Sequence, residues 1–536
     1  MSRILTLLLC CLPTAASAES PPLWGSLQPG KYRVGFQSHW EFDYARTYQM
    51  TFADKTTYAA GKAPRPILFN IWYPAEPVEE MQPMKHRQYL DITTDDPRLK
   101  TLATELVKYN RQVLIKEMLG QAEEKITPAE LKLFDEVMNS PTASLREAPP
   151  AAGQFPLVLY HSGYGSSFED NAVLCEYLAS HGFVVVGSAF QEPSGKTFNI
   201  DGKDTSGIDM AFLIHTARQL PFVDWKHVGI IGHSGGAHAS LVYRARINSP
   251  VDAVVSLDTT QDYYSLADTR WDLMTRPVLA HREHFSGPVL VAANPHAHFP
   301  LFDALTRSDR YYLTLRDLGH NDFISQGVME HLVQSRHKPG PESQKKYDAV
   351  RHSYDQLCVS IRSFLQAELR GDRGSWEKLQ AEYGATPLGT AAPHLDMAKV
   401  GTGAASLPPL EQLEAQVLLT PRLVRPCLKK YEIEKTLSLL TALHQKNPES
   451  PCFQHSFAYA LVFELLEDRN QLGEARAIHT FYRQHVPEYK DYFYSMAKFF
   501  AERGRRDDAL INLRKALQLQ PDHAEALAKL RELEKK

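Results

Sequence analysis

The sequence has no excess of either charge and no basic block. Its 59 Lys and Arg residues against 63 Asp and Glu residues give a formal net charge of −4. Proteins that bind nucleic acid usually carry a basic patch, so this balance argues against a nucleic-acid partner. The chain also lacks a phosphate-cradling glycine-rich loop and a dinucleotide-binding fingerprint. We therefore expect no cofactor of that kind.

Long apolar runs are equally scarce. One short run, Ile4–Leu12, follows the positive charge of Arg3 and precedes the small residues Ala16–Ala18. This order is typical of a secretory signal peptide, and the run is too short to remain as a permanent membrane span. We predict a signal peptide over residues 1–18 and a mature chain that begins at Glu19. The protein is then exported, to the periplasm or out of the cell.

Cysteine is rare, with four residues left after position 18: Cys175, Cys358, Cys427 and Cys452. An exported protein can oxidise such thiols, and Cys427 with Cys452 is the better placed pair. Four buried free thiols are an equally acceptable interpretation.

A metal-binding set is also missing. His296 and His298 are separated by one residue, but no spaced carboxylates or thiolates complete the three or four ligands that zinc requires. The two histidines are better explained by a loop that lines a pocket or faces solvent. We predict that the protein uses no metal.

A chain of 536 residues is too long for one compact core, so we expect at least two domains. Residues 27–73 are rich in alternating, strand-like segments. A polar insertion follows over about 95–138, with apolar residues at helical spacing from Thr101 to Leu119. The insertion is either a lid over a cleft or a peripheral decoration.

From Phe155 onwards, apolar strands alternate with helical stretches. Continuous apolar runs such as Leu157–Tyr160 are typical of parallel strands that are covered on both faces. The alternation predicts a doubly wound, mostly parallel α/β sheet. The expected strands end at Leu315 and the expected closing helix covers residues 347–369, which gives an α/β domain over residues 19–370.

The remainder of the chain is expected to be helical and repetitive. Residues 371–412 contain Gly, Pro, Ala and Thr clusters, which favour a linker. Residues 413–536 show tetratricopeptide-like spacing, because Ala475 and Pro487 lie one repeat of about 34 residues before Ala509 and Pro521. A helical bundle without repeats is the alternative. Stacked repeats would offer a concave surface to a protein or peptide partner.

The sequence Gly-His-Ser-Gly-Gly at 232–236 directly follows the apolar run Val228–Ile231. A strand, a tight turn and a helix in this order form a nucleophile elbow, which lifts a serine above the sheet. We therefore predict Ser234 as a nucleophile. The amide of Gly235 would face the oxygen that becomes negative during acyl transfer.

A serine nucleophile needs a base and a group that orients the base. His320 lies just after the last predicted strand, on the edge of the sheet where Ser234 is expected. For the acid, Asp258 directly follows the strand 253–257. The next loop offers Asn294 first and no carboxylate before Asp303, so Asp258 is the better candidate.

The second oxyanion amide should follow the first buried strand of the sheet. The turn Gly163–Gly165 lies there, and we predict the amide of Tyr164 for this role. An ordinary turn between a strand and a helix is the alternative.

These segments together resemble a known family. The segments Phe155–Leu159, Gly163–Gly165, Leu178–Val185, Ile71–Pro74 and Gly232–Gly236 look like the platelet-activating-factor acetylhydrolase branch of the α/β-hydrolases, with dienelactone-hydrolase-like proteins as close relatives. The resemblance covers residues 30–370.

The resemblance implies a serine esterase or lipase that acts on a small ester or lipid without metal. It also implies an acid after the strand that follows the elbow, where Asp258 lies, and a histidine that matches His320. One departure is visible, since the family commonly has histidine directly before the Gly-x-Gly turn. Here Ser162 stands there and His161 comes one residue earlier.

The sequence thus predicts an exported serine hydrolase that cleaves short-acyl esters through Ser234, His320 and Asp258. The competing hypothesis is a binding or scaffold protein whose hydrolase fold has lost useful activity and which acts through its helical repeats. We also expect a chain that ends near Arg370 to remain folded and active.

Overall fold

The computed structural model describes residues 20–535 apart from 52–56, 79, 191–204, 247, 265, 267–271, 387, 389, 402–406, 418, 468–470, 490 and 503. The predicted signal peptide therefore lies outside the described residues. Among the residues that are described, no helix combines the length and the apolar character needed to cross a bilayer.

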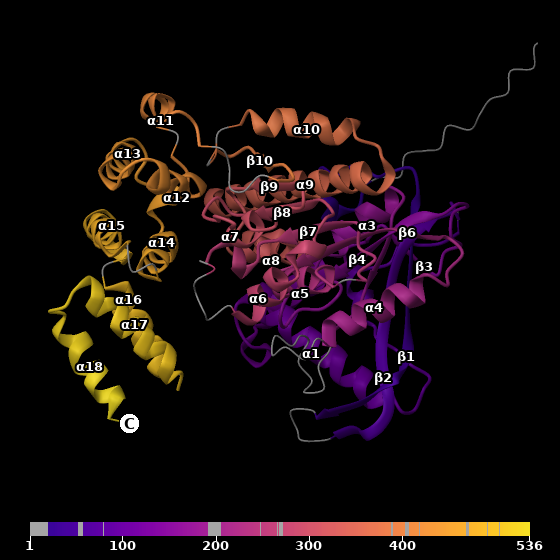
Figure 1. Cartoon of the computed structure of the whole chain (residues 1–536). Helices are drawn as coiled ribbons and strands as arrows, with labels where there is room; N and C mark the ends of the chain where they lie inside the picture. The colour runs from indigo at the N-terminus through magenta and orange to yellow at the C-terminus, as the bar shows by residue number, and fades with distance from the viewer. Residues whose placement is uncertain are drawn as a thin grey trace, which may run out of the picture.

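A ten-stranded sheet forms the centre of the molecule, with strand order β10-β9-β8-β7-β6-β4-β5-β2-β1-β3 (Figure 1). Strands β4 to β9 are parallel to one another, whereas β2 pairs antiparallel with β5 and β10 pairs antiparallel with β9. The predicted doubly wound, mostly parallel sheet is confirmed. The strands are β1 (Arg33–Thr51), β2 (Thr57–Ala75), β3 (Ser144–Arg146), β4 (Phe155–His161), β5 (Val184–Gly187), β6 (Val223–His233), β7 (Ala253–Leu257), β8 (Val289–Ala293), β9 (Arg310–Thr314) and β10 (His394–Ala398).

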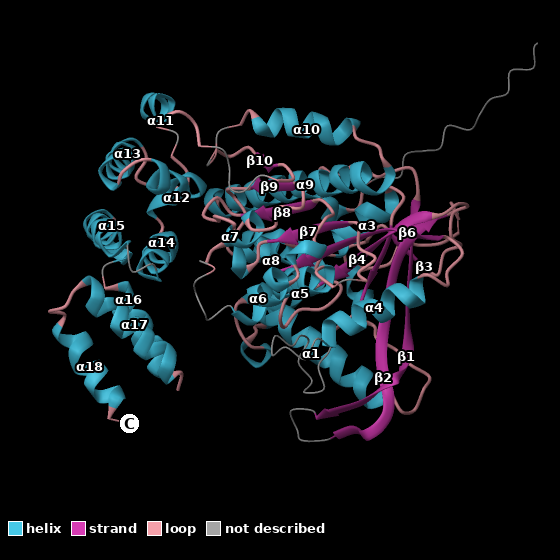
Figure 2. Cartoon of the chain, viewed as in Figure 1, coloured by secondary structure: helices cyan, strands magenta, loops and turns pink. Residues whose placement is uncertain are grey.

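Helices cover both faces of the sheet, and a second group of helices follows at the C-terminal end (Figure 2). The helices up to the last strand are α1 (Lys100–Leu119), α2 (Pro128–Met138), α3 (Ala172–Ser180), α4 (Thr205–Ala217), α5 (Gly235–Arg244), α6 (Asp272–Ala280), α7 (Pro300–Asp303), α8 (Ser325–His337), α9 (Pro341–Arg370) and α10 (Gly374–Gly384). The later helices are α11 (Leu410–Gln416), α12 (Pro421–Lys430), α13 (Ile433–Lys446), α14 (His455–Glu467), α15 (Leu472–His485), α16 (Tyr492–Glu502), α17 (Arg506–Leu519) and α18 (Ala524–Glu534).

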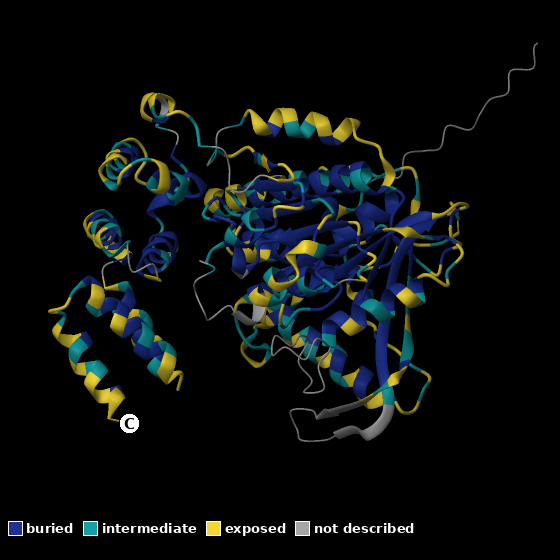
Figure 3. Cartoon of the chain, viewed as in Figure 1, coloured by how far each residue is buried: buried dark blue, intermediate teal, exposed yellow. Residues whose placement is uncertain are grey.

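The central strands are buried on both faces, as their continuous apolar sequences predict. Along β4, Val158 and Tyr160 belong to one hydrophobic cluster, while Leu157 and Leu159 belong to the cluster on the opposite face. Helices α3 and α9 contribute to the first cluster, and α4 and α5 to the second. Figure 3 shows the central strands mostly in dark blue, the colour of buried residues. Such a sheet exposes chemistry only at its edges, mainly at the carboxyl ends of its strands.

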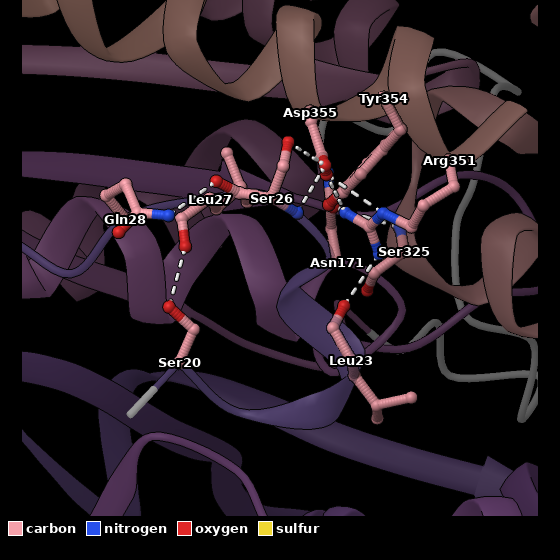
Figure 4. A network of polar contacts seen from close by, with 10 residues as sticks. All are labelled: Ser20, Leu23, Ser26, Leu27, Gln28, Asn171, Ser325, Arg351, Tyr354 and Asp355. Atoms are coloured by element: carbon pink, nitrogen blue, oxygen red, sulfur yellow. Dashed lines mark hydrogen bonds and ion pairs between the residues drawn. The ribbon is translucent and has the colours of Figure 1, made fainter. Parts of the chain in front are cut away.

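The start of the described chain is fastened to α9 (Figure 4). Asp355 accepts hydrogen bonds from the backbone N–H and the hydroxyl of Ser26, each at 2.7 Å. Arg351 donates to the carbonyl of Leu23 at 2.6 Å and also pairs with Asp355. These contacts hold the first residues after the predicted cleavage site against the closing helix.

The insertion at 95–138 folds into α1 and α2, and both helices pack on α8. The hydroxyl of Tyr109 in α1 donates to the carbonyl of Gly165 at 3.4 Å, and the amide of Asn110 donates to Ser167 Oγ at 3.1 Å. The insertion therefore contacts the loop after β4, which carries Tyr164.

Residues 371–412 are not simply a linker, so the predicted boundary at residue 370 is wrong. Within this range, α10 places Trp376 against Tyr311 of β9 and Phe364 of α9, with ring centroids 5.2 and 5.5 Å apart. Strand β10 then extends the sheet by pairing with β9. In β10, which lies at the edge of the sheet, only Leu395 and Ala398 are buried, so the strand has neither a continuous apolar run nor a clear alternation.

The later helices have a hydrophobic cluster of their own. Helices α16 and α17 pack on each other, and the positions that match the repeat template are buried in both: Phe493, Ala497, Phe500, Ala509, Leu513 and Ala516. Figure 1 shows these helices as a separate column beside the sheet. The cysteines Cys175, Cys358, Cys427 and Cys452 are all buried free thiols, so the Cys427–Cys452 pair does not form a disulfide.

Candidate active site

Ser234 occupies a strained turn between β6 and α5. Its φ of 52° and ψ of −120° lie in a region that non-glycine residues rarely adopt. A Cβ on Gly232 would lie 2.4 Å from Cα of Ala237, and a Cβ on Gly236 would lie 2.3 Å from the carbonyl oxygen of His161. Glycine at both positions therefore lets strand and helix approach closely, which lifts the serine hydroxyl above the sheet.

His320 lies on the loop after β9 and contacts both other members of the predicted triad. Its Nε2 is 3.0 Å from Ser234 Oγ, and its Nδ1 is 2.7 Å from Asp258 Oδ2. Because a carboxylate can only accept, Nδ1 carries the proton and Nε2 is left to accept from the serine hydroxyl. This tautomer is the one that a general base needs.

Asp258 is buried directly after β7, with its backbone at a φ of 40°. Besides His320, its carboxylate accepts from the hydroxyl of Tyr263 through Oδ1. The backbone N–H of Asn294 approaches the same oxygen at 3.4 Å. These two donors hold one carboxylate oxygen, so the other is directed at the imidazole.

Asp303, the other carboxylate considered for this role, is engaged elsewhere. Its Oδ1 accepts from the hydroxyl of Tyr312 at 2.7 Å and from Nη2 of Arg422 at 2.8 Å. The structure therefore brings Ser234, His320 and Asp258 together and directs Asp303 towards the C-terminal helices.

His233 fixes the backbone of the base. Its Nε2 donates to the carbonyl oxygen of His320 at 3.0 Å, and the two rings lie 4.9 Å apart. Burial, helped by the neighbouring His320, lowers the pKa of His233 to about 4. The residue is thus neutral at physiological pH and adds no charge beside the imidazole that must accept the serine proton.

The turn after β4 passes directly beside the nucleophile. A Cβ on Gly163 would lie 3.3 Å from Cβ of Ser234 and 3.1 Å from Nδ1 of His233. Tyr164 follows with its side chain exposed, and Gly235 begins α5 on the other side of the serine. Gly163 therefore lies close to Ser234, and Tyr164 is the next residue in the turn.

His161 and Ser162 stand where the sequence departs from the pattern of the family that it resembles, and both are buried. The ring of His161 stacks on Phe190 with centroids 3.7 Å apart, and its Nδ1 bonds to the carbonyl oxygen of Ser162 at 2.8 Å. Burial lowers the pKa of His161 to about 4. His161 is a buried packing residue, and both residues present their carbonyl oxygens to Gly236.

His296 and His298 are not among the described residues that gather in a group of three potential metal ligands. His298 bonds to the carbonyl oxygen of Tyr263 at 2.7 Å, while the backbone N–H of His296 donates to Asn294 Oδ1 at 2.9 Å. Within the described part of the chain, only His281, Glu283 and His284 gather as three potential metal ligands. That group is largely solvent-exposed and lies outside the site, with Arg307 donating to the Glu283 carbonyl at 3.1 Å.

Sequence reasoning missed three supporting residues: Tyr263, Asn294 and His233. Tyr263 and Asn294 both contact Asp258, and the Asn294 side chain also donates to the carbonyl oxygen of Leu318 at 3.3 Å. The sequence indicated His233 only as a residue of the elbow motif, without a role of its own. None of these roles has a local signature, because each depends on loops that meet through the sheet.

The arrangement can accept a proton from the serine hydroxyl and hold the resulting imidazolium. These are the requirements of acyl transfer. A dedicated metal or cofactor is not needed for any of these steps.

Comparisons with known proteins give little beyond this geometry. No family model matches the chain, and no curated protein matches it. Among solved structures, the chain is similar to a ferulic acid esterase from Streptomyces cinnamoneus, with 17% sequence identity and a TM-score of 0.40. The match covers 64% of this chain and 91% of that one. A likeness of this size carries no information on substrate.

Proposed function

We propose that the protein is a serine hydrolase of carboxylic esters that acts through an acyl-enzyme. The observation that supports this most directly is the uninterrupted series of contacts from Ser234 Oγ through the His320 imidazole to Asp258 at a nucleophile elbow. A family resemblance of residues 30–370 supports short-acyl esters of small molecules or lipids as substrates.

In the proposed mechanism, Ser234 Oγ attacks the ester carbonyl while His320 Nε2 takes the hydroxyl proton. The amides of Gly235 and Tyr164 stabilise the oxyanion of the tetrahedral intermediate. When the intermediate collapses, the bond to the alcohol breaks and the alcohol leaves with the proton from His320. Water, deprotonated by the same imidazole, then attacks the acyl carbonyl. The acyl bond to Ser234 Oγ breaks as the imidazole returns its proton to that oxygen, and the acid is released. Asp258 keeps the imidazole oriented and stabilises its charged form.

Covalent labelling tests the nucleophile. A fluorophosphonate probe should label the wild-type protein at Ser234 and should not label Ser234→Ala. A panel of nitrophenyl esters should show turnover that is highest for short acyl chains. A folded wild-type protein that neither reacts with the probe nor hydrolyses any ester would favour the scaffold hypothesis instead.

The proposal includes export, which the pattern of Arg3, Ile4–Leu12 and Ala16–Ala18 supports. N-terminal sequencing of protein produced with its own leader should find Glu19 as the first residue. Retention of Met1 in the exported fraction, or the absence of such a fraction, would contradict this part.

We propose tetratricopeptide-like repeats for the C-terminal helices, supported by the burial of the template positions in α16 and α17. A protein or peptide partner for these helices remains an expectation. Binding of the purified full-length protein to an immobilised peptide library tests it, with a chain that lacks α13 to α18 as the control.

A further inference from the structure

The C-terminal helices reach the triad through one continuous series of contacts. Arg425, on α12, donates from Nη1 to Nδ1 of His298 at 3.3 Å. His298 donates from Nε2 to the carbonyl oxygen of Tyr263 at 2.7 Å, and the Tyr263 hydroxyl donates to the carboxylate of Asp258. Arg425, His298 and Tyr263 thus connect α12 of the C-terminal helices with Asp258.

The chemistry of the partners fixes the state of His298. A guanidinium can only donate, so Nδ1 of His298 must be unprotonated, and a carbonyl can only accept, so Nε2 must carry the proton. Burial and the charge of Arg425 both keep the pKa of His298 well below its usual range. The ring is therefore a neutral connector with one defined tautomer.

Backbone N–H groups also connect the two loops that His298 joins. The backbone N–H groups of His298 and Phe299 donate to the carbonyl oxygen of Asp262 at 2.9 and 3.0 Å. The Asn294 N–H approaches Asp258 from the same loop. A displacement of His298 would therefore move the segment that carries Asp258 and Tyr263.

Arg425 is itself held in place by the helices. It forms an ion pair with Glu464 of α14, and its guanidinium lies 6.0 Å from the ring of Phe457, which in turn contacts the ring of His298. The side chain of Arg425 is only 18% exposed. Its position therefore depends on how α12 and α14 pack together.

From these contacts we infer that Arg425 is a positioning residue for the triad, so that the C-terminal helices form part of the catalytic apparatus. The inference rests on the proposed function of Ser234, His320 and Asp258. Arg425 touches neither substrate nor reacting atoms. It acts through His298 and Tyr263 by keeping the Asp258 carboxylate at hydrogen-bond distance from His320.

The test compares full-length variants by the hydrolysis of nitrophenyl acetate across pH. Arg425→Ala and His298→Leu should each lower kcat about tenfold while KM changes less than about twofold. His298→Gln retains a donor for Tyr263 and an acceptor for Arg425, so it should restore most of the rate. Arg476→Ala is the matched control, because Arg476 binds the carbonyl of Gln518 within the helices.

The pH profile separates positioning from a loss of stability. The titratable groups that face His320 are Asp258 and His233. If the Asp258 carboxylate shifts away, the imidazolium loses stabilisation and the acid limb of kcat/KM moves to lower pH. A merely structural role would lower the melting temperature without moving this limb. The inference would be overturned if Arg425→Ala melts like the wild type and keeps the wild-type kcat and acid limb. If Arg425→Ala does not fold, Arg425→Lys is used in its place.

A second measurement distinguishes this inference from the proposed function. If the wild-type protein hydrolyses no ester and its Ser234 is not labelled, the proposed function fails. The downfield proton NMR resonance of the Nδ1–H between His320 and Asp258 still reports their contact. This resonance should shift or broaden in Arg425→Ala and stay unchanged in Arg476→Ala. A resonance that is unchanged in both variants would by itself overturn the inference that Arg425 positions Asp258.

Discussion

Nη2 of Arg422 lies 2.8 Å from Oδ1 of Asp303, and the same guanidinium is stacked 3.7 Å above the ring of Tyr312. Arg422 belongs to α12, whereas Tyr312 belongs to β9 of the sheet. This contact removes Asp303 from competition for the histidine and makes it part of the interface with the C-terminal helices.

Replacing Asp258 and replacing Asp303 should therefore have very different effects on turnover. Asp258→Asn should lower turnover by about 10⁴-fold with little change in folding, because the amide stabilises the wrong tautomer of His320. Asp303→Asn should leave the turnover number within about threefold of wild type, since Asp303 bonds to Arg422 and Tyr312, which are not part of the triad. Steady-state kinetics and urea unfolding of both variants check this. Near-complete loss of activity in Asp303→Asn with activity retained in Asp258→Asn would contradict the assignment of the acid.

The elbow should not tolerate a side chain at Gly232. A Cβ there would lie 2.4 Å from the backbone of Ala237, so Gly232→Ala should reduce the free energy of unfolding by about 3 kcal/mol and abolish labelling of Ser234. The matched control is Gly473→Ala in α15, where a Cβ meets nothing within 4 Å. That change should leave stability equal or raise it by up to about 1 kcal/mol. Equal unfolding curves for the two variants would show that the elbow can relax.

The shortest truncated chain that still folds should end after residue 370, because the sheet continues to β10. Contrary to the expectation from the sequence, a chain that ends at Arg370 should aggregate, because it loses β10 and Trp376 and leaves the edge of β9 unpaired. A chain that ends at Gly401 keeps both elements and should remain monomeric, with a cooperative thermal transition. Size-exclusion chromatography and thermal melting compare the two. A soluble, cooperatively folded chain ending at Arg370 would contradict this role of β10.

Buried carboxyl groups near the β4 loop should make stability depend on pH. Burial raises the pKa of Asp170 and of Glu169 to about 7, above their values in an unfolded chain. The folded state then holds protons that the unfolded state releases, so this stability is complete below about pH 4 and is lost as pH rises towards 7. Each group adds a slope of up to about 1.4 kcal/mol per pH unit. Asp170→Asn should flatten the profile of unfolding free energy between pH 4 and 7, whereas Asp95→Asn at an exposed position should not.

The strands and helices of the central sheet could largely be predicted from local sequence. The helix expected over Thr101–Leu119 is observed at Lys100–Leu119, and the apolar run Leu157–Tyr160 lies inside β4. Periodicity and buried runs carry this information because each element must bury a face of its own. Strand β10 escaped prediction because its partner β9 is distant in the sequence and its outer edge is open, so that it has no continuous apolar run.

The candidate site divides in the same way. The sequence by itself determined the elbow at Ser234 and the position of His320 after the last parallel strand, because motif and strand order are local properties. Only the tertiary structure decided that Asp258 contacts His320, that Asp303 is paired with Arg422, and that Arg425 reaches the acid loop. These outcomes depend on which loops the sheet and the helices bring together in space, and residue spacing along the chain does not specify that.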